Sequence, residues 1–216
     1  MKEHSGPSDA AADTDLLRRA LGTFATGVTV VTVGGETPHA MTANSFTSVS
    51  LDPPLVLVCV EQSAVMHSSL LARGTFGVSV LAAHQGPVAR QFASRLRPLG
   101  LAQFDAVDWR PGRFTGAPLI AGALAHFECG LWRTYDGGDH TIFVGNLLSV
   151  ESSRGERSEP SGVGLVSRGE RSEPSGVGTR PADSDAVIFF RGRFRQLAQE
   201  ITGITPELTA ERQVAT

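Results

Sequence analysis

The chain has 216 residues, of which 41% are hydrophobic and 19% charged, with a formal net charge of −3. This composition excludes a disordered chain, and the length fits one globular domain. The slight negative charge argues against nucleic acid or an anionic membrane as a partner.

Lysine and cysteine usage narrows the chemistry further. Lys2 is the only lysine, which excludes phosphate loops and Schiff-base mechanisms that need an internal lysine. Cys59 and Cys129 lie in apolar runs, as buried thiols of a reducing compartment do. The sequence has neither an apolar run of membrane-spanning length nor an apolar export core near its start, so we expect a cytoplasmic protein without membrane association.

The N-terminal part predicts a tail followed by a helix. Residues 1–13 are small and polar and are expected to be disordered. A helix capped by Thr14 or Asp15 follows, with leucines along one face, and should end by Gly27.

Strand patterns then take over. Residues 28–33 are rich in β-branched side chains and precede Gly34-Gly35, a pair suited to a tight turn. The segment 39–50 alternates small, polar and apolar residues. Residues 55–60 form a continuous apolar run, which predicts a strand buried on both faces.

Later segments continue this pattern with short helices between strands. Helices are expected over 64–71 and 85–96, with a strand over 76–81 between them. Two long strands over 124–135 and 140–150 should be joined by the turn Asp-Gly-Gly-Asp, and a last strand covers 186–190. Many strands, few helices and no βαβ rhythm predict a mainly β fold, an antiparallel barrel with peripheral helices.

An internal repeat interrupts the last part of the chain. The sequence SRGERSEPSGVG occurs at 153–164 and again at 167–178. This period is too short for a solenoid unit, and the segment has almost no large apolar residues. We therefore expect a duplicated, disordered loop insertion at about 151–183 within a single domain over 14–216.

The first candidate site is a polar stretch beside apolar strands. Small hydroxyls and backbone N–H groups can bind an anion without lysine, and an Asn amide can bind a planar ring edge. The residues concerned are Thr42, Asn44, Ser45, Thr47, Ser48 and Ser50. A polar strand face exposed to water would give the same pattern.

Other candidates are charged or lie at element ends. Ser63 could cap the next helix and contact a phosphate, and Arg90, Arg95 and Arg97 could add positive charge near an anionic ligand. Each of these also suits an ordinary cap or a solvated helix arginine.

His140 follows the glycine turn, at a strand end where a site could open. Asp139 beside it could fix the tautomer or charge of the imidazole. The histidines and cysteines show no metal-ligand spacing, so no metal site is predicted. The hydrolase motif GxSxG and the dinucleotide motif GxGxxG are both absent.

Five sequence blocks in order carry a family resemblance. They are GVTVVTV, HAMTANSFTSVSLDPPLVLVCV, GALAHFEC, GDHTIFVGNL and FFRGRFRQL, between about Leu16 and Leu197. Together they resemble the short-chain flavin reductases, the NAD(P)H:flavin oxidoreductase components of two-component flavin-dependent monooxygenases. Within that family the resemblance leans towards reductases that serve aromatic hydroxylases and antibiotic pathways.

The resemblance implies a split β-barrel of the flavin reductase-like FMN-binding type, working as a homodimer with flavin in a groove near the subunit interface. His140 would lie against the nicotinamide of NADH (or NADPH), as the residue placed at the reaction itself. Reduced FAD or FMN would then pass to a separate monooxygenase. The implied cofactor-binding residues are Thr42, Ala43, Asn44, Ser45, Thr47, Ser48, Val49, Ser50, Cys59, Val60, Ser63, Phe190 and Arg193.

Two alternatives stay open from the sequence. One is a split-barrel oxidase that keeps its flavin and oxidises a phosphorylated amine, although the lack of internal lysine counts against it. The other is a flavin- or haem-binding module without turnover.

Overall fold

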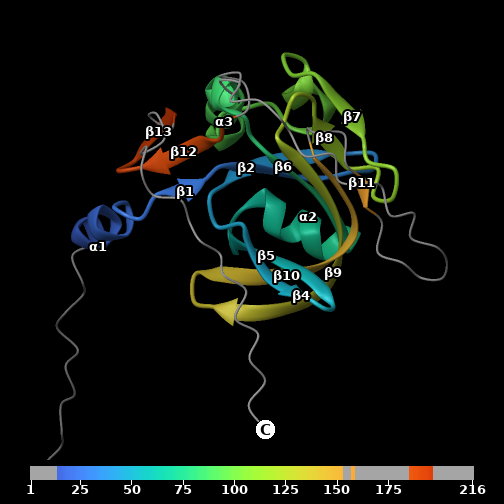
Figure 1. Ribbon diagram of the computed structural model, residues 1–216, viewed down its shortest axis with the longest axis horizontal. Coiled ribbons are helices and arrows are strands. Elements are labelled where there is room, and N and C mark those ends of the chain that lie inside the picture. The colour runs from blue at the N-terminus through green and yellow to red at the C-terminus, as the bar shows by residue number, and fades with distance from the viewer. Residues whose placement is uncertain (1–13, 153–156, 159–184, 197–216) are drawn as a thin grey trace, which may run out of the picture.

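The computed structural model describes residues 14–152, 157–158 and 185–196. Strands dominate this part of the chain, and every strand pair is antiparallel, which confirms the predicted mainly β fold (Figure 1). The helices are α1 (Thr14–Leu21), α2 (Val65–Arg73) and α3 (Gly86–Ala93), with 3-10 helices η1 (Ala83–Gln85) and η2 (Gly100–Phe104). The strands are β1 (Thr26–Gly27), β2 (Thr29–Val33), β3 (His39–Ala43), β4 (Thr47–Leu51), β5 (Pro54–Glu61), β6 (Thr75–Val80), β7 (Trp109–Pro111), β8 (Pro118–Ile120), β9 (Ala125–Gly137), β10 (His140–Ser152), β11 (Arg157–Ser158), β12 (Val187–Phe190) and β13 (Arg193–Gln196).

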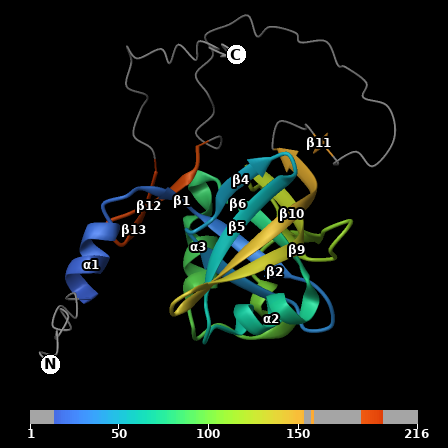
Figure 2. The same ribbon diagram turned by 90° about the horizontal axis from the view of Figure 1, so that it is seen from below.

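The main sheet curls into a barrel that does not close. Its strands follow the order β3-β2-β6-β9-β10-β5-β4, and β11 pairs with β10. The path ends at β3 and β4, which are not paired with each other in the described part of the chain. Figure 2 shows the strands wrapping around one another, with α2 packed against the barrel. The split lies between two strands that are neighbours in sequence.

The barrel interior is apolar, and β2, β5 and β6 line it with alternate residues. On β5, Val56, Val58 and Val60 are buried in the core, while Cys59 and Glu61 are only half-buried and face the other way. The expectation that 55–60 is buried on both faces is therefore wrong. The outer face of β5 is left available to line a site.

The long hairpin of β9 and β10 confirms the turn predicted from Asp-Gly-Gly-Asp. Gly138 has φ +79°, a conformation that favours glycine, and its N–H donates to Asp136 Oδ1 at 3.1 Å. Both strands are longer than expected, with 13 residues each. The tip of this hairpin carries His140 at the start of β10.

Two predicted helices are shorter in the structure. Helix α1 ends at Leu21 rather than near Gly27. Thr26 and Gly27 are not helical, because they form the short strand β1, which pairs with β12. Helix α3 covers only 86–93 of the predicted 85–96, since Ser94 is extended with ψ 129°. The three residues after Ser94 thus form a loop, and this loop carries Arg95 and Arg97.

An arm stands off the barrel on one side. Helix α1 leads into β1, which pairs with β12, and β12 pairs with β13 (Figures 1 and 2). The apolar face of α1 and Phe24, three residues beyond its end, are exposed; the residues are Leu16, Leu17, Leu21 and Phe24. A single copy of the chain leaves this arm largely uncovered.

The structure describes two short parts of the expected insertion at about 151–183. Glu151 and Ser152 belong to β10, and residues 157–158 form β11. The remainder of that segment, and the expected tail at 1–13, lie outside the described residues.

Candidate functional site

A cavity of about 490 Å³ opens where β3 and the ends of β5 and β10 meet α2 and α3. Its volume is in the range of small-molecule sites. Seven residues expected from the sequence line it: Thr42, Ala43, Asn44, Ser45, Cys59, Ser63 and His140. Residues from four separated segments are thus brought to one site.

The hydroxyls of Ser45 and Thr42 hold this wall in place. Ser45 Oγ donates to the carbonyl of Cys59 and accepts from its N–H, both at 3.0 Å, so it replaces strand pairing beside β5. Thr42 Oγ1 donates to the Ala89 carbonyl at 2.8 Å and ties β3 to α3. Since these hydroxyl protons are used, a ligand would meet mainly hydroxyl oxygens, backbone groups and the exposed amide of Asn44.

The other predicted binding residues do not line the cavity. Val60 is 1% exposed and faces the barrel core. Neighbouring residues of a strand point to opposite faces, so Val60 faces away from the cavity that Cys59 lines. Thr47, Ser48, Val49 and Ser50 lie on the edge strand β4, which runs away along β5 with Thr47 opposite Leu57.

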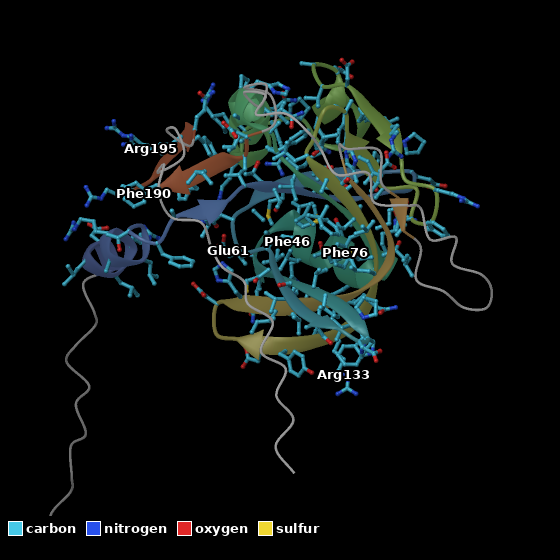
Figure 3. All side chains as sticks on the ribbon, viewed as in Figure 1. Phe46, Glu61, Phe76, Arg133, Phe190 and Arg195 are labelled. Atoms are coloured by element: carbon cyan, nitrogen blue, oxygen red, sulfur yellow. The ribbon has the colours of Figure 1, made fainter. Side chains whose placement is uncertain are left out.

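Phe190 and Arg193 lie on the β12–β13 hairpin of the arm. Figure 3 shows the labelled Phe190 outside the barrel, on the side away from Phe76. Neither residue reaches the cavity of its own chain.

Ser63 does not cap the helix that follows it, so that prediction is wrong. The N-cap of α2 is Ala64, with no side-chain cap, while Ser63 Oγ donates to Glu61 Oε1 at 2.8 Å. Glu61 Oε2 also accepts from Arg95 at 2.8 Å, which joins β5 to the loop after α3. The first residues of α2 still line the cavity, with their N–H groups at a helix start.

His140 is placed at the rim by the hairpin tip. It pairs in register with Glu61, and Gln62 holds the tip through hydrogen bonds to the carbonyls of Gly138 and Asp139, both at 3.0 Å. His140 Nδ1 lies 2.7 Å from Asp139 Oδ1. This hydrogen bond and the imidazole charge lower the pKa of Asp139. The carboxylate therefore orients the ring, as expected, and leaves Nε2 for another partner.

Sequence reasoning did not single out His39, which is 5% exposed and lines the cavity beside Arg97. Its Nε2 lies 3.1 Å from Arg97 Nη2. Burial and the Arg97 charge lower the pKa of His39 to about 4, so the ring is neutral and Nε2 accepts. Only its place three residues before Thr42, where the polar stretch begins, could have indicated a role. Of the three arginines considered from the sequence, Arg95 and Arg97 line the cavity and Arg90 does not.

Cys59 lines the cavity as a thiol, because burial raises its pKa. Within the described ranges, no group of three or more His, Cys, Asp or Glu side chains could hold a metal ion. Over the same ranges, no helix is both long and apolar enough to cross a membrane.

Comparisons with known proteins agree on one family. The model of the flavin reductase like domain matches residues 21–198. An NADH-dependent FAD reductase of Streptomyces globisporus is 63% identical over 134 residues, which cover 62% of this chain and 74% of that protein. An NADH-dependent flavin reductase of a Rhodococcus species is 42% identical over 151 residues, or 68% of this chain and 82% of that protein.

Solved structures match the fold over most of the chain. BorF, the flavin reductase component of a bacterial two-component tryptophan halogenase, matches with TM-score 0.69 and 53% identity, covering 87% of this chain and 100% of its own. SgcE6, a Streptomyces globisporus NADH:FAD oxidoreductase solved with NAD and FAD fragments, matches with TM-score 0.70 and 47% identity, covering 88% and 95%. These matches confirm the split-barrel fold.

Proposed function

The chain belongs to the flavin reductase family, and we propose that it is an NADH-dependent flavin reductase that transfers a hydride from NADH to FAD or FMN. The observation that carries this proposal is the convergence of Thr42–Ser45, Cys59, Ser63 and His140 on one cavity. Relatives of this chain are reductases named for FAD and for FMN, and the more similar ones are named for FAD. We therefore propose FAD as the preferred flavin.

The cavity fits a flavin in size and in its donor groups. A bound flavin accepts hydride at N5 when the nicotinamide ring is stacked on it, so the protein has mainly to position two rings. The amide of Asn44 and the backbone after Thr42 would bind the polar edge of the flavin ring. The N–H groups at the start of α2, around Val65, would bind a phosphate.

His140 would position NADH. Its ring is held by Asp139 through Nδ1 at the cavity rim, which leaves Nε2 for a ligand. No group on the chain need accept or donate a proton in the hydride step, so we assign His140 to binding rather than to acid–base catalysis.

His140→Ala is expected to raise KM for NADH several-fold while flavin affinity changes little, since about 1 kcal/mol of one hydrogen bond corresponds to roughly fivefold. Steady-state kinetics and flavin fluorescence titration measure the two effects. Arg133→Ala, on the same hairpin but outside the cavity, is the control. Equal losses for both ligands would contradict the assignment.

We propose that reduced flavin leaves the enzyme and serves a separate flavin-dependent monooxygenase in aromatic or natural-product metabolism. Relatives include reductase subunits of such monooxygenases and the reductase of a halogenase. We place the reaction in the cytoplasm, consistent with two free cysteines in the fold.

We also propose a homodimer, with a second copy covering the arm. The exposed apolar face of α1 supports this, since such a face is stable in water only at a cost. Phe190 and Arg193 on the arm could then reach the cavity of the other copy. This arrangement would give them the role that the resemblance implies.

The double variant Leu21→Asp, Phe24→Asp is expected to shift the protein from dimer to monomer, because it places charges on the contact face. Analytical ultracentrifugation at several concentrations measures this. Leu51→Asp is the matched control, since Leu51 is 93% exposed on β4, away from the arm. A wild-type monomer at all concentrations would contradict the proposal.

The proposed function is tested by the loss of NADH absorbance on addition of FAD or FMN. Rapid loss with free flavin in excess over protein supports a reductase. Tight flavin binding without NADH oxidation would instead indicate a binding module.

A further inference from the structure

Arg97 is a half-buried cation in the cavity wall without a carboxylate beside it. Its Nη2 donates to the Ala40 carbonyl and to His39 Nε2, and its Nη1 donates to the Ser94 carbonyl. Arg97 Nε is buried and has no hydrogen-bond partner. Among the residues that the structure describes, all its partners are neutral.

Two other arginines that line cavities each form an ion pair with a carboxylate. Arg95 pairs with Glu61 at 2.8 Å, and Arg110 pairs with Glu151 at 2.7 Å. Within the main cavity, Arg95 and Glu61 therefore cancel, and the positive charge of Arg97 is left over. Removing a guanidinium from water without a counter-charge is costly, so an uncompensated one in a ligand-sized cavity indicates an anionic ligand.

The neighbours of Arg97 hold the guanidinium in one plane without reducing its charge. His39 is neutral and accepts from Nη2, while the Ala40 carbonyl accepts from the same nitrogen. Three of the five N–H groups are thus used; the second N–H of Nη1 is left for a ligand, while the N–H of Nε is buried in the wall without a partner. A fixed guanidinium with an unpaired charge and an unused Nη1 donor suits the oxygens of a phosphate.

On the basis of the proposed function, we propose that Arg97, oriented by His39, is a specificity-determining residue that binds phosphate oxygens of the nucleotide held in the cavity. Its neutral carbonyl and imidazole partners distinguish it from Arg95, whose charge is already paired. The phosphate belongs to the flavin nucleotide or to NADH, and the experiment separates the two.

The test compares ligands that differ only in phosphate. Riboflavin has none, FMN has one, and FAD has a pyrophosphate. For Arg97→Gln we expect the Kd of FMN and FAD to rise about tenfold, with riboflavin changed less than about twofold, if the flavin supplies the phosphate. If NADH supplies it, the flavin Kd values stay and KM for NADH rises about tenfold.

The matched variants separate charge from structure. Arg90→Gln removes the same charge from exposed Arg90 on α3, outside the cavity, and should change none of these constants. Arg97→Lys keeps a cation and should recover part of the phosphate-dependent affinity. Equal weakening of riboflavin, FMN and NADH would mean that Arg97 only holds the loop, which overturns the inference. No effect on any ligand overturns it too.

Wild-type protein gives a measurement that does not depend on the variants folding. Pyrophosphate should compete with FMN, or inhibit with respect to NADH, but should not compete with riboflavin. Absence of both effects overturns the inference. If wild-type protein binds no flavin and oxidises no NADH, the proposed function fails; normal turnover with unchanged ligand selectivity in Arg97→Gln overturns only the role of Arg97.

Discussion

Glu128→Ala is expected to lower the free energy of unfolding by about 3–5 kcal/mol, because it removes the buried carboxylate that a cluster of partly buried donors shares. Glu128 is 3% exposed on β9. It accepts from the N–H groups of Arg113, Phe114 and Thr115 at 2.8–3.1 Å, and from the hydroxyls of Thr115 at 2.9 Å and Ser149 at 3.2 Å. Urea denaturation at neutral pH measures the loss.

Glu128→Gln separates charge from shape. The amide keeps one acceptor but directs N–H groups at other donors, so we expect a loss of about 2 kcal/mol. Exposed Glu36→Gln is the control and should change stability by less than about 0.5 kcal/mol. Similar small effects for both positions would show that the hydrogen-bond cluster contributes little.

The loss of stability at acid pH gives a second measure of the hydrogen bonds to Glu128. Burial alone would raise the pKa of Glu128, but the hydrogen bonds from Thr115, Phe114 and Ser149 outweigh it and lower the pKa below its usual 4.5. As the pH falls, the carboxyl of Glu128 therefore binds a proton in the unfolded chain before it does so in the folded protein. The stability that Glu128 contributes is fully present above pH 4.5 and is lost at lower pH. Glu128→Gln should abolish that loss.

The sequence predicted elements best where turn chemistry and strand pattern agree. The β9–β10 hairpin was predicted because glycines mark the turn and apolar residues flank it, and both signals are local. The end of α3 was predicted too late in the chain. Residues 94–96 fit the helical pattern, but Ser94 is extended and Leu96 is 96% exposed. The contacts of Arg97 with β3 hold the chain there instead, and these contacts are not local in sequence.

The site was predicted only in part for a similar reason. His140 starts a strand after a glycine turn, where a polar residue is conspicuous. Asn44 directly follows the end of β3 and stands in a run of small polar residues. Residues Thr47–Ser50 carry the same polar pattern but follow the turn into β4, so they leave the cavity. Glu61 and His39 join it through strand register and packing, which no local spacing reveals.

For His39→Gln we expect the free energy of unfolding to fall less steeply than in the wild type as the pH drops from 6.5 to about 4. In the folded protein, burial and the nearby Arg97 charge lower the pKa of His39 from 6.5 to about 4. Between these values the unfolded chain binds more protons, so stability falls as pH falls, by roughly 3 kcal/mol in total from this group. Glutamine can still accept from Arg97 but does not titrate.

Urea midpoints from pH 7 to pH 4 measure the effect, with the variant and wild type compared at each pH. Some slope should persist in the variant, since burial also lowers the pKa of His126. Parallel curves would show that His39 keeps an ordinary pKa and does not face Arg97 as a neutral ring. A shallower variant curve, with the two proteins close at pH 7, would establish that His39 is neutral in the folded protein, where it accepts from Arg97.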